Sequence, residues 1–222
     1  MNNQRNSDTT LKPTRINALS DGVFAIVMTL LVIELSVPIV SKLKASEELG
    51  GMLLEMWPKF FAFAISFLIL GILWFIHQNQ FRYIKRSNGI FSWINIFFLI
   101  MVALVPFSTA LIGEYHIYSK IAVVFYGTNG FLGMLMLNIV WWYASKNYRL
   151  IDKKTEPKTI KQIQIRLIVS TAIFIPAIAL SFVDPLISIA LYVFDSLFGI
   201  IGTMIWGGKD STLSAEKLQS IA

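Results

Sequence analysis

The sequence predicts an all-α integral membrane protein that folds as one domain of six transmembrane helices. Of its 222 residues, 55% are hydrophobic and only 14% are charged, and the mean hydropathy is +0.65. A soluble domain carries charge on about a quarter of its residues. The apolar residues form six runs, each near the roughly 20 residues that a helix needs to cross a bilayer. No strand-like alternation competes with these runs, so a helical bundle is expected.

The six expected spans follow one another with short connections. They cover approximately residues 16–38, 54–82, 89–111, 118–145, 164–183 and 185–207, and residues 208–222 follow as a short tail. Asp184 and Pro185 predict a tight turn between the last two spans, because proline suits the first position of a helix. Pro58, Pro106 and Pro176 lie inside the second, third and fifth spans, where they predict kinks or local loosening.

The distribution of basic residues predicts the direction of the chain. With the N-terminus in the cytoplasm, only four of the 19 lysines and arginines fall outside: Lys42, Lys44, Lys59 and Lys120. Such a bias follows the positive-inside rule. Both termini of this multi-pass protein are therefore expected in the cytoplasm.

Composition also argues against several other functions. There is no cysteine, and the two histidines are far apart, so no metal centre is expected. The acidic residues are scattered singly, and no nucleophile has a base at helical spacing. No phosphate-binding glycine motif and no nucleic-acid-binding patch is present. We expect no enzymatic activity, no cofactor and no nucleic-acid partner.

The first span, LSDGVFAIVMTLLVIELSVP, carries a carboxylate near each end, at Asp21 and Glu34. An acidic residue at bilayer depth is a functional hypothesis by default. A helix that starts near Thr14 or Arg15 has a comfortable length and places Ser20 and Asp21 inside it.

Two stripes run along this helix. Ile26, Leu30 and Ile33 lie on one face, with Thr29 beside them. The second stripe holds Ser20, Phe24, Val27, Leu31 and Glu34. By composition alone, the first stripe indicates contact with lipid or with another helix.

The stretch RINALSDGVFAIVMTLLVIEL resembles the RxxxFSD signature and first span of the transmembrane-protein-175 family, the endosomal and lysosomal potassium channels and their single-repeat bacterial relatives. The residues at the expected positions are Arg15, Ser20, Asp21, Gly22, Phe24, Ala25, Ile26 and Thr29. Leu19 departs from the pattern, because the family typically has phenylalanine there.

The resemblance implies a homotetramer in which four copies of the first helix line a pore. Ile26, Leu30 and Ile33 would form its hydrophobic layers, and Thr29 would add hydroxyls, so that a potassium ion passes near Ile26, Thr29 and Leu30. Glu34 would attract cations at the outer mouth.

The resemblance also implies a polar network at the cytoplasmic end of the first helix. It would include Arg15, Ser20 and Asp21 from this helix. Near its cytoplasmic end, the second span reads LWFIHQNQF. The family pattern places a tryptophan and a histidine of this stretch in the same network, and in this sequence they are Trp74 and His77.

The expected function is a potassium-selective leak channel. The fragment FYGTNGF does not match the TVGYG loop of carbonyl filters, so an apolar constriction would have to select the ion. The alternative is a proton- or ion-coupled secondary transporter, with Asp21, Asp195 and His77 as relays. Potassium and membrane lipids are the other expected partners.

Overall fold

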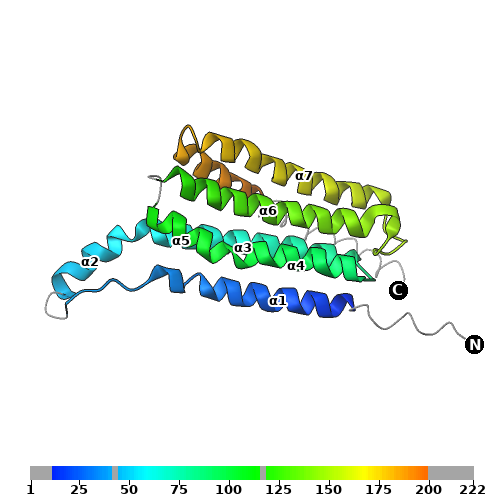
Figure 1. Cartoon of the computed structure of the whole chain (residues 1–222), viewed down its shortest axis with the longest axis horizontal. Helices are drawn as coiled ribbons and strands as arrows, with labels where there is room; N and C mark the ends of the chain where they lie inside the picture. Colours follow the sequence, from blue (N-terminus) through cyan, green and yellow to red (C-terminus); the bar gives the residue numbers. More distant parts are fainter. Residues whose placement is uncertain (1–11, 42–44, 116–118, 200–222) are drawn as a thin grey trace, which may run out of the picture.

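The computed structural model describes residues 12–41, 45–115 and 119–199, and these residues form an elongated helical bundle (Figure 1). In chain order the elements are α1 (Pro13–Leu30), the 3₁₀ helix η1 (Ile33–Leu35), α2 (Ala45–Glu55), α3 (Trp57–Tyr83), α4 (Gly89–Ala103), α5 (Val105–Tyr115), α6 (Lys120–Ser145), the 3₁₀ helix η3 (Lys146–Tyr148) and α7 (Pro157–Leu180). One further helix, Pro185–Gly199, follows α7 and is called the last helix below. The all-helical prediction is confirmed, since the described residues form no strand beyond an isolated bridge between Ile84 and Ile151.

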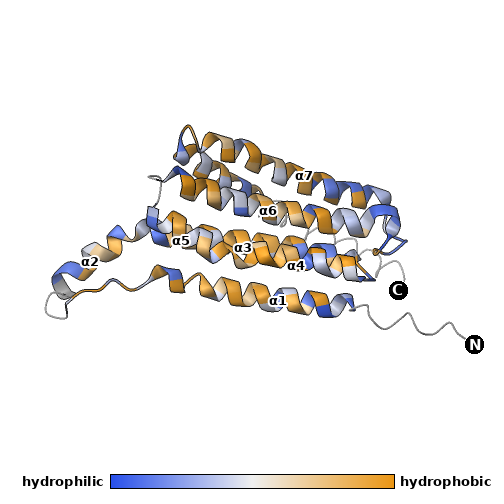
Figure 2. Cartoon of the chain, in the orientation of Figure 1, coloured by the Kyte–Doolittle hydropathy of each residue, from blue (hydrophilic) through white to orange (hydrophobic). Residues whose placement is uncertain are grey.

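Within the described ranges, five helical segments are long and apolar enough to cross a membrane. They are Pro13–Leu35, Trp57–Tyr83, Gly89–Tyr115, Lys120–Tyr148 and Pro157–Leu180. Apolar residues occupy the middle of the bundle and polar residues gather toward its ends (Figure 2). The last helix is apolar but shorter, and the sixth predicted span, 185–207, runs beyond the described residues, as does the predicted tail.

The prolines act mainly at helix ends. Pro58 lies in the first turn of α3, because α2 and α3 are separate helices, so the expected kink inside a span is absent there. Pro106 lies just after the break between α4 and α5. Helix α7 continues through Pro176. The turn before Pro185 is as predicted, with Asp184 Oδ1 accepting a hydrogen bond from the backbone N–H of Leu186 at 2.8 Å.

Helix α1 lies along one side of the bundle, against α3 and α4 (Figure 1). Extended backbone follows η1, and α2 projects beyond the bundle before the chain returns through α3. Helices α6 and α7 pack together on the far side from α1. One face of α1 therefore remains uncovered by the described residues.

Candidate functional site

Helix α1 has a buried face that holds it against the bundle. Ile16, Ser20, Phe24 and Val27 are buried along it, and Leu31 is buried just after its end. Steps of three and four residues keep these side chains on one side of the helix. The predicted stripe is thus confirmed from Ser20 to Leu31. Glu34 is exposed, because the chain has changed to the 3₁₀ helix η1 there.

The opposite face carries the side chains predicted to line a pore. Ile26 is 61% exposed, Leu30 42% and Ile33 67%, and Thr29 beside them is exposed as well. The Thr29 hydroxyl donates to the carbonyl of Ile26 at 2.7 Å. Its oxygen therefore keeps lone pairs that can meet a cation. We call these residues, Ile26, Thr29 and Leu30 of α1 and Ile33 of η1, the outer face of α1.

Small residues continue this exposed side toward the start of the helix. Ala18, Gly22 and Ala25 are all exposed. A Cβ atom added at Gly22 would meet no atom of the described chain within 4 Å, so the packing of one copy does not require glycine there. Small residues at this spacing let helices approach closely in membranes. The outer face and these residues together suit contact between copies of α1.

Asp21 is held by neutral donors from α1 and α3. Its carboxylate accepts a hydrogen bond from Trp74 Nε1 at 2.9 Å and another from the amide of Gln78. Asn17 Nδ2 lies 3.3 Å from Asp21 Oδ2 and 3.2 Å from Gln78 Oε1. Hydrogen bonds to an ionised acceptor are stronger than those between neutral groups. This surface cluster (Asn17, Asp21, Trp74 and Gln78) fastens the first turns of α1 to α3.

A second, buried chain lies behind the surface cluster. Asn95 Nδ2 donates to Ser20 Oγ at 3.0 Å, and Ser20 donates in turn to the carbonyl of Ile16 at 3.0 Å. Asn95 Oδ1 lies 2.9 Å from His77 Nε2. Because an amide oxygen only accepts, His77 carries its proton on Nε2 and leaves a buried, unpartnered Nδ1. The Ser20–Asn95–His77 chain thus joins α1, α3 and α4.

Aromatic rings fix the orientation of His77. The imidazole is fully buried and stacks on Phe81 with centroids 4.4 Å apart and on Phe98 with centroids 5.4 Å apart. Phe24, from the buried face of α1, lies 6.4 Å from the same ring. This packing makes His77 a rigid support for α1.

Four of the five predicted network residues are brought together in this way. Ser20, Asp21, Trp74 and His77 connect α1 to its neighbours. The Arg15 side chain is exposed and makes no hydrogen bond or ion pair with the described residues. Asn17, Gln78 and Asn95 were not among the predicted network residues. A lone amide in the apolar run FSWINIFFLI was the one visible signal for Asn95.

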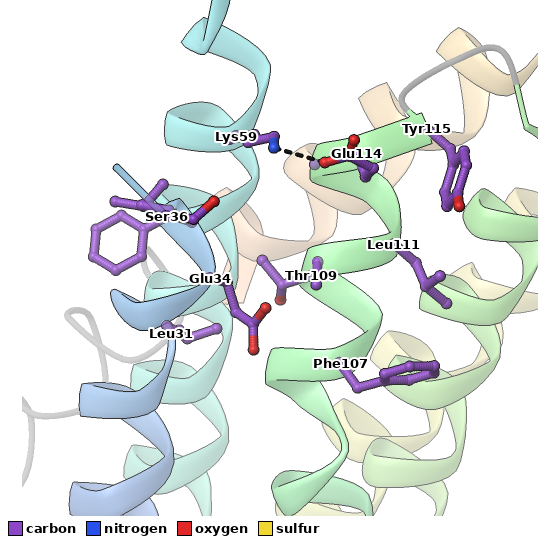
Figure 3. A pocket seen from close by; sticks show the side chains of 13 residues that line it. Leu31, Glu34, Ser36, Lys59, Phe107, Thr109, Leu111, Glu114 and Tyr115 are labelled. Atoms are coloured by element: carbon purple, nitrogen blue, oxygen red, sulfur yellow. Dashed lines mark ion pairs between the residues drawn. The ribbon is translucent and has the colours of Figure 1, made fainter. Parts of the chain in front are cut away.

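The other end of α1 borders a cavity of about 280 Å³ between η1, α3 and α5. Figure 3 shows Glu34 pointing between α1 and α5, with Thr109 on the facing helix. On the rim, Lys59 Nζ pairs with Glu114 Oε2 at 2.6 Å. Lys59 is thereby held by another carboxylate, and the Glu34 carboxylate adds negative charge to this cavity at the end of α1.

Several known proteins are similar to this chain in sequence. Residues 15–106 match the model of the family described as endosomal/lysosomal potassium channel TMEM175. A potassium channel of Chamaesiphon minutus is 33% identical over 179 residues, which cover 80% of this chain and 88% of that protein. A potassium channel of Streptomyces collinus is 30% identical over 181 residues, which cover 80% and 86%.

A solved structure also resembles most of this chain. The crystal structure of a lysosomal potassium-selective channel TMEM175 homolog from Chamaesiphon minutus superposes with a TM-score of 0.76 at 29% identity, and the match covers 86% of this chain and 97% of that one. The motif at the start of α1 lies inside the family match. This chain belongs to the TMEM175 family.

Proposed function

We propose that this chain is the subunit of a potassium channel in which the outer faces of α1 from four copies enclose the pore. The observation that carries the proposal is the outer face itself, an apolar surface of Ile26, Leu30 and Ile33 that the described chain leaves open. Similarity to proteins named as potassium channels supports potassium as the permeant ion. The small residues Gly22 and Ala25 support close approach of neighbouring copies.

In this proposal the pore selects by a narrow apolar constriction. Rings of Ile26, Leu30 and Ile33 offer a passing ion little in return for the water that it sheds. Potassium holds its water less tightly than sodium, so its barrier is lower. The hydroxyl oxygen of Thr29 gives a potassium ion its one polar contact near Ile26 and Leu30. A ring of this kind also closes by dewetting when it narrows.

The polar groups around α1 then have a supporting role. The surface cluster and the Ser20–Asn95–His77 chain fix the rotation of α1, so that Ile26 faces away from its own bundle. The Arg15 side chain, which has no partner among the described residues, reaches a neighbouring copy and completes the network there. Glu34 raises the concentration of cations at the outer mouth.

The orientation follows from charge. The start of α1, the end of α3 and the connection between α6 and α7 lie at one end of the bundle (Figure 1) and carry many of the basic residues. The positive-inside rule places this end in the cytoplasm. The bacterial relatives fit a protein of the bacterial plasma membrane, surrounded by lipid.

Proteoliposomes with a potassium gradient test the proposal, with sodium as the competing ion. A potassium channel gives a current that reverses at the potassium equilibrium potential. This reversal potential shifts little when sodium is added. A coupled transporter instead gives saturable exchange with a fixed stoichiometry. The molar mass of the purified particle is the first check, because a monomer cannot enclose the proposed pore.

A further inference from the structure

The last helix carries a carboxylate with no role in the proposed pore. Asp195 Oδ1 is buried and has no hydrogen-bond partner in the described chain. The Ser170 side chain of α7 lines the same small cavity as this carboxylate. Asp195 makes no ion pair with the described residues. An ionised carboxylate without a cationic partner is costly inside a membrane protein and marks a functional position.

Asp195 borders a small internal cavity of about 30 Å³ between α3, α6, α7 and the last helix. Its polar lining comes from Asp195, Ser196 and Ser170. A second cavity, of about 60 Å³, shares Ile76, Met134, Ser170 and Gly199 with the first. Since one water needs roughly 10–15 Å³ of such space, the two cavities together have room for several water molecules.

The second cavity leads toward the end of the bundle where α1 begins. Asn79, Gln80 and Arg166 line it. Gln80 is only 1% exposed, and its Oε1 has no hydrogen-bond partner in the described chain. Because buried polar atoms are normally satisfied, this unpartnered amide oxygen indicates water in the crevice. Polar groups thus run from Arg166 and Asn79 past Ser170 to Asp195.

The lining decides which ligand Asp195 can take. Hard cations such as Ca²⁺ need six or more oxygens, and the wall beside Asp195 is otherwise mostly apolar, with Ile69, Ile72 and Leu73 from α3. Ser196 already donates to the carbonyl of Tyr192 at 2.7 Å. A proton needs only one carboxylate oxygen and removes the uncompensated charge.

Few other charged or titratable groups face this position. Arg166 of α7 lines the mouth of the crevice. Tyr192 of the last helix points its hydroxyl toward the carbonyl of Val123 on α6, at 3.5 Å. The residues of α3 and α6 that line the cavity at Asp195 carry no titratable side chain. Helix α1 packs against α3 and α4, so this position also lies apart from the outer face.

We propose that Asp195 is a proton-binding site inside each subunit, reached by water through the crevice between α3, α7 and the last helix. The carboxylate accepts a proton from water at the mouth near Asn79 and Arg166 and returns it by the same route. This site is additional to the proposed pore and does not depend on it.

Water access can be tested with single cysteines, because the chain has none of its own. In proteoliposomes, Ag⁺ should react with Ser170→Cys faster than with Thr171→Cys. Thr171 is the matched control because it is adjacent and buried, bonds to Asn138 and lines neither cavity. Adding Asn79→Trp to Ser170→Cys should slow the reaction. Equal rates for Ser170→Cys and Thr171→Cys, or no effect of the tryptophan, would overturn the route.

Proton uptake can be tested by infrared difference spectroscopy during a pH titration. The protein should show the C=O stretch of a protonated carboxylic acid, and this band should be lost in Asp195→Asn and kept in Glu34→Gln. Asp195→Glu should shift the band without removing it, which covers the case in which the asparagine variant does not fold. A spectrum that is unchanged by either Asp195 variant would overturn the site. Neither measurement involves potassium flux, so the result is independent of the pore.

Discussion

The link between Asn95 and His77 allows a quantitative test of how α1 is held. In Asn95→Leu, the buried Nε2–H of His77 loses its acceptor at 2.9 Å, whereas Ser20 keeps its bond to the carbonyl of Ile16. A buried donor left unsatisfied costs about 1–3 kcal/mol. Hydrogen bonds between membrane helices average about 0.6 kcal/mol, and this value sets the lower end of the expected loss in stability. We expect a loss of about 0.6–2 kcal/mol in the free energy of unfolding.

The double variant isolates this term. His77→Phe retains a ring against Phe81 and Phe98 but strands Asn95 Oδ1. Removing both partners, in Asn95→Leu with His77→Phe, should be less destabilising than the sum of the two single changes. The midpoint of thermal unfolding in detergent measures the difference, at about 2–4 °C per kcal/mol for a chain of this size. Additive single effects would refute the coupling.

Three further changes test the pore. Ile26→Asn should wet the constriction and raise the sodium-to-potassium permeability ratio, and an unchanged ratio would remove Ile26 from the pore. Glu34→Gln should lower potassium current at low ionic strength but not at high salt, because salt screens exposed charges. The matched control is Glu114→Gln, which changes a carboxylate that is already paired with Lys59. Equal effects of the two changes on the current would contradict the role of Glu34. Gly22→Leu should shift the molar mass of the particle below that of a tetramer, whereas Gly50→Leu on the projecting α2 should not; an intact Gly22→Leu tetramer would exclude contact there.

Periodicity predicted the buried face of α1 well, because the spacing of residues along the sequence alone determines that face. Ser20, Phe24, Val27 and Leu31 are spaced for one helical face, and that face is buried. Periodicity did not predict α2. Its sequence, ASEELGGMLLE, contains two glycines and three glutamates and has too little apolar length to read as a span. The second expected span therefore began near residue 54 and placed Pro58 inside it.

The partners of Asp21 and His77 could be predicted only in part. The family motif indicated Ser20, Trp74 and His77, but Asn17, Gln78 and Asn95 come from three different helices, α1, α3 and α4. Which amide meets which carboxylate depends on how these helices rotate against one another, and no local pattern encodes that rotation. Arg15 differs again, because its side chain has no partner among the described residues.

The pore itself is tested most directly by cysteines at two positions of equal exposure. Ile26 on α1 is 61% exposed and Ile175 on α7 is 60% exposed. The chain has no cysteine of its own, so each variant carries a single one. A cationic methanethiosulfonate reagent should stop potassium flux through Ile26→Cys in proteoliposomes and leave flux through Ile175→Cys unchanged. Flux that persists after complete modification of Ile26→Cys would contradict a pore lined by α1.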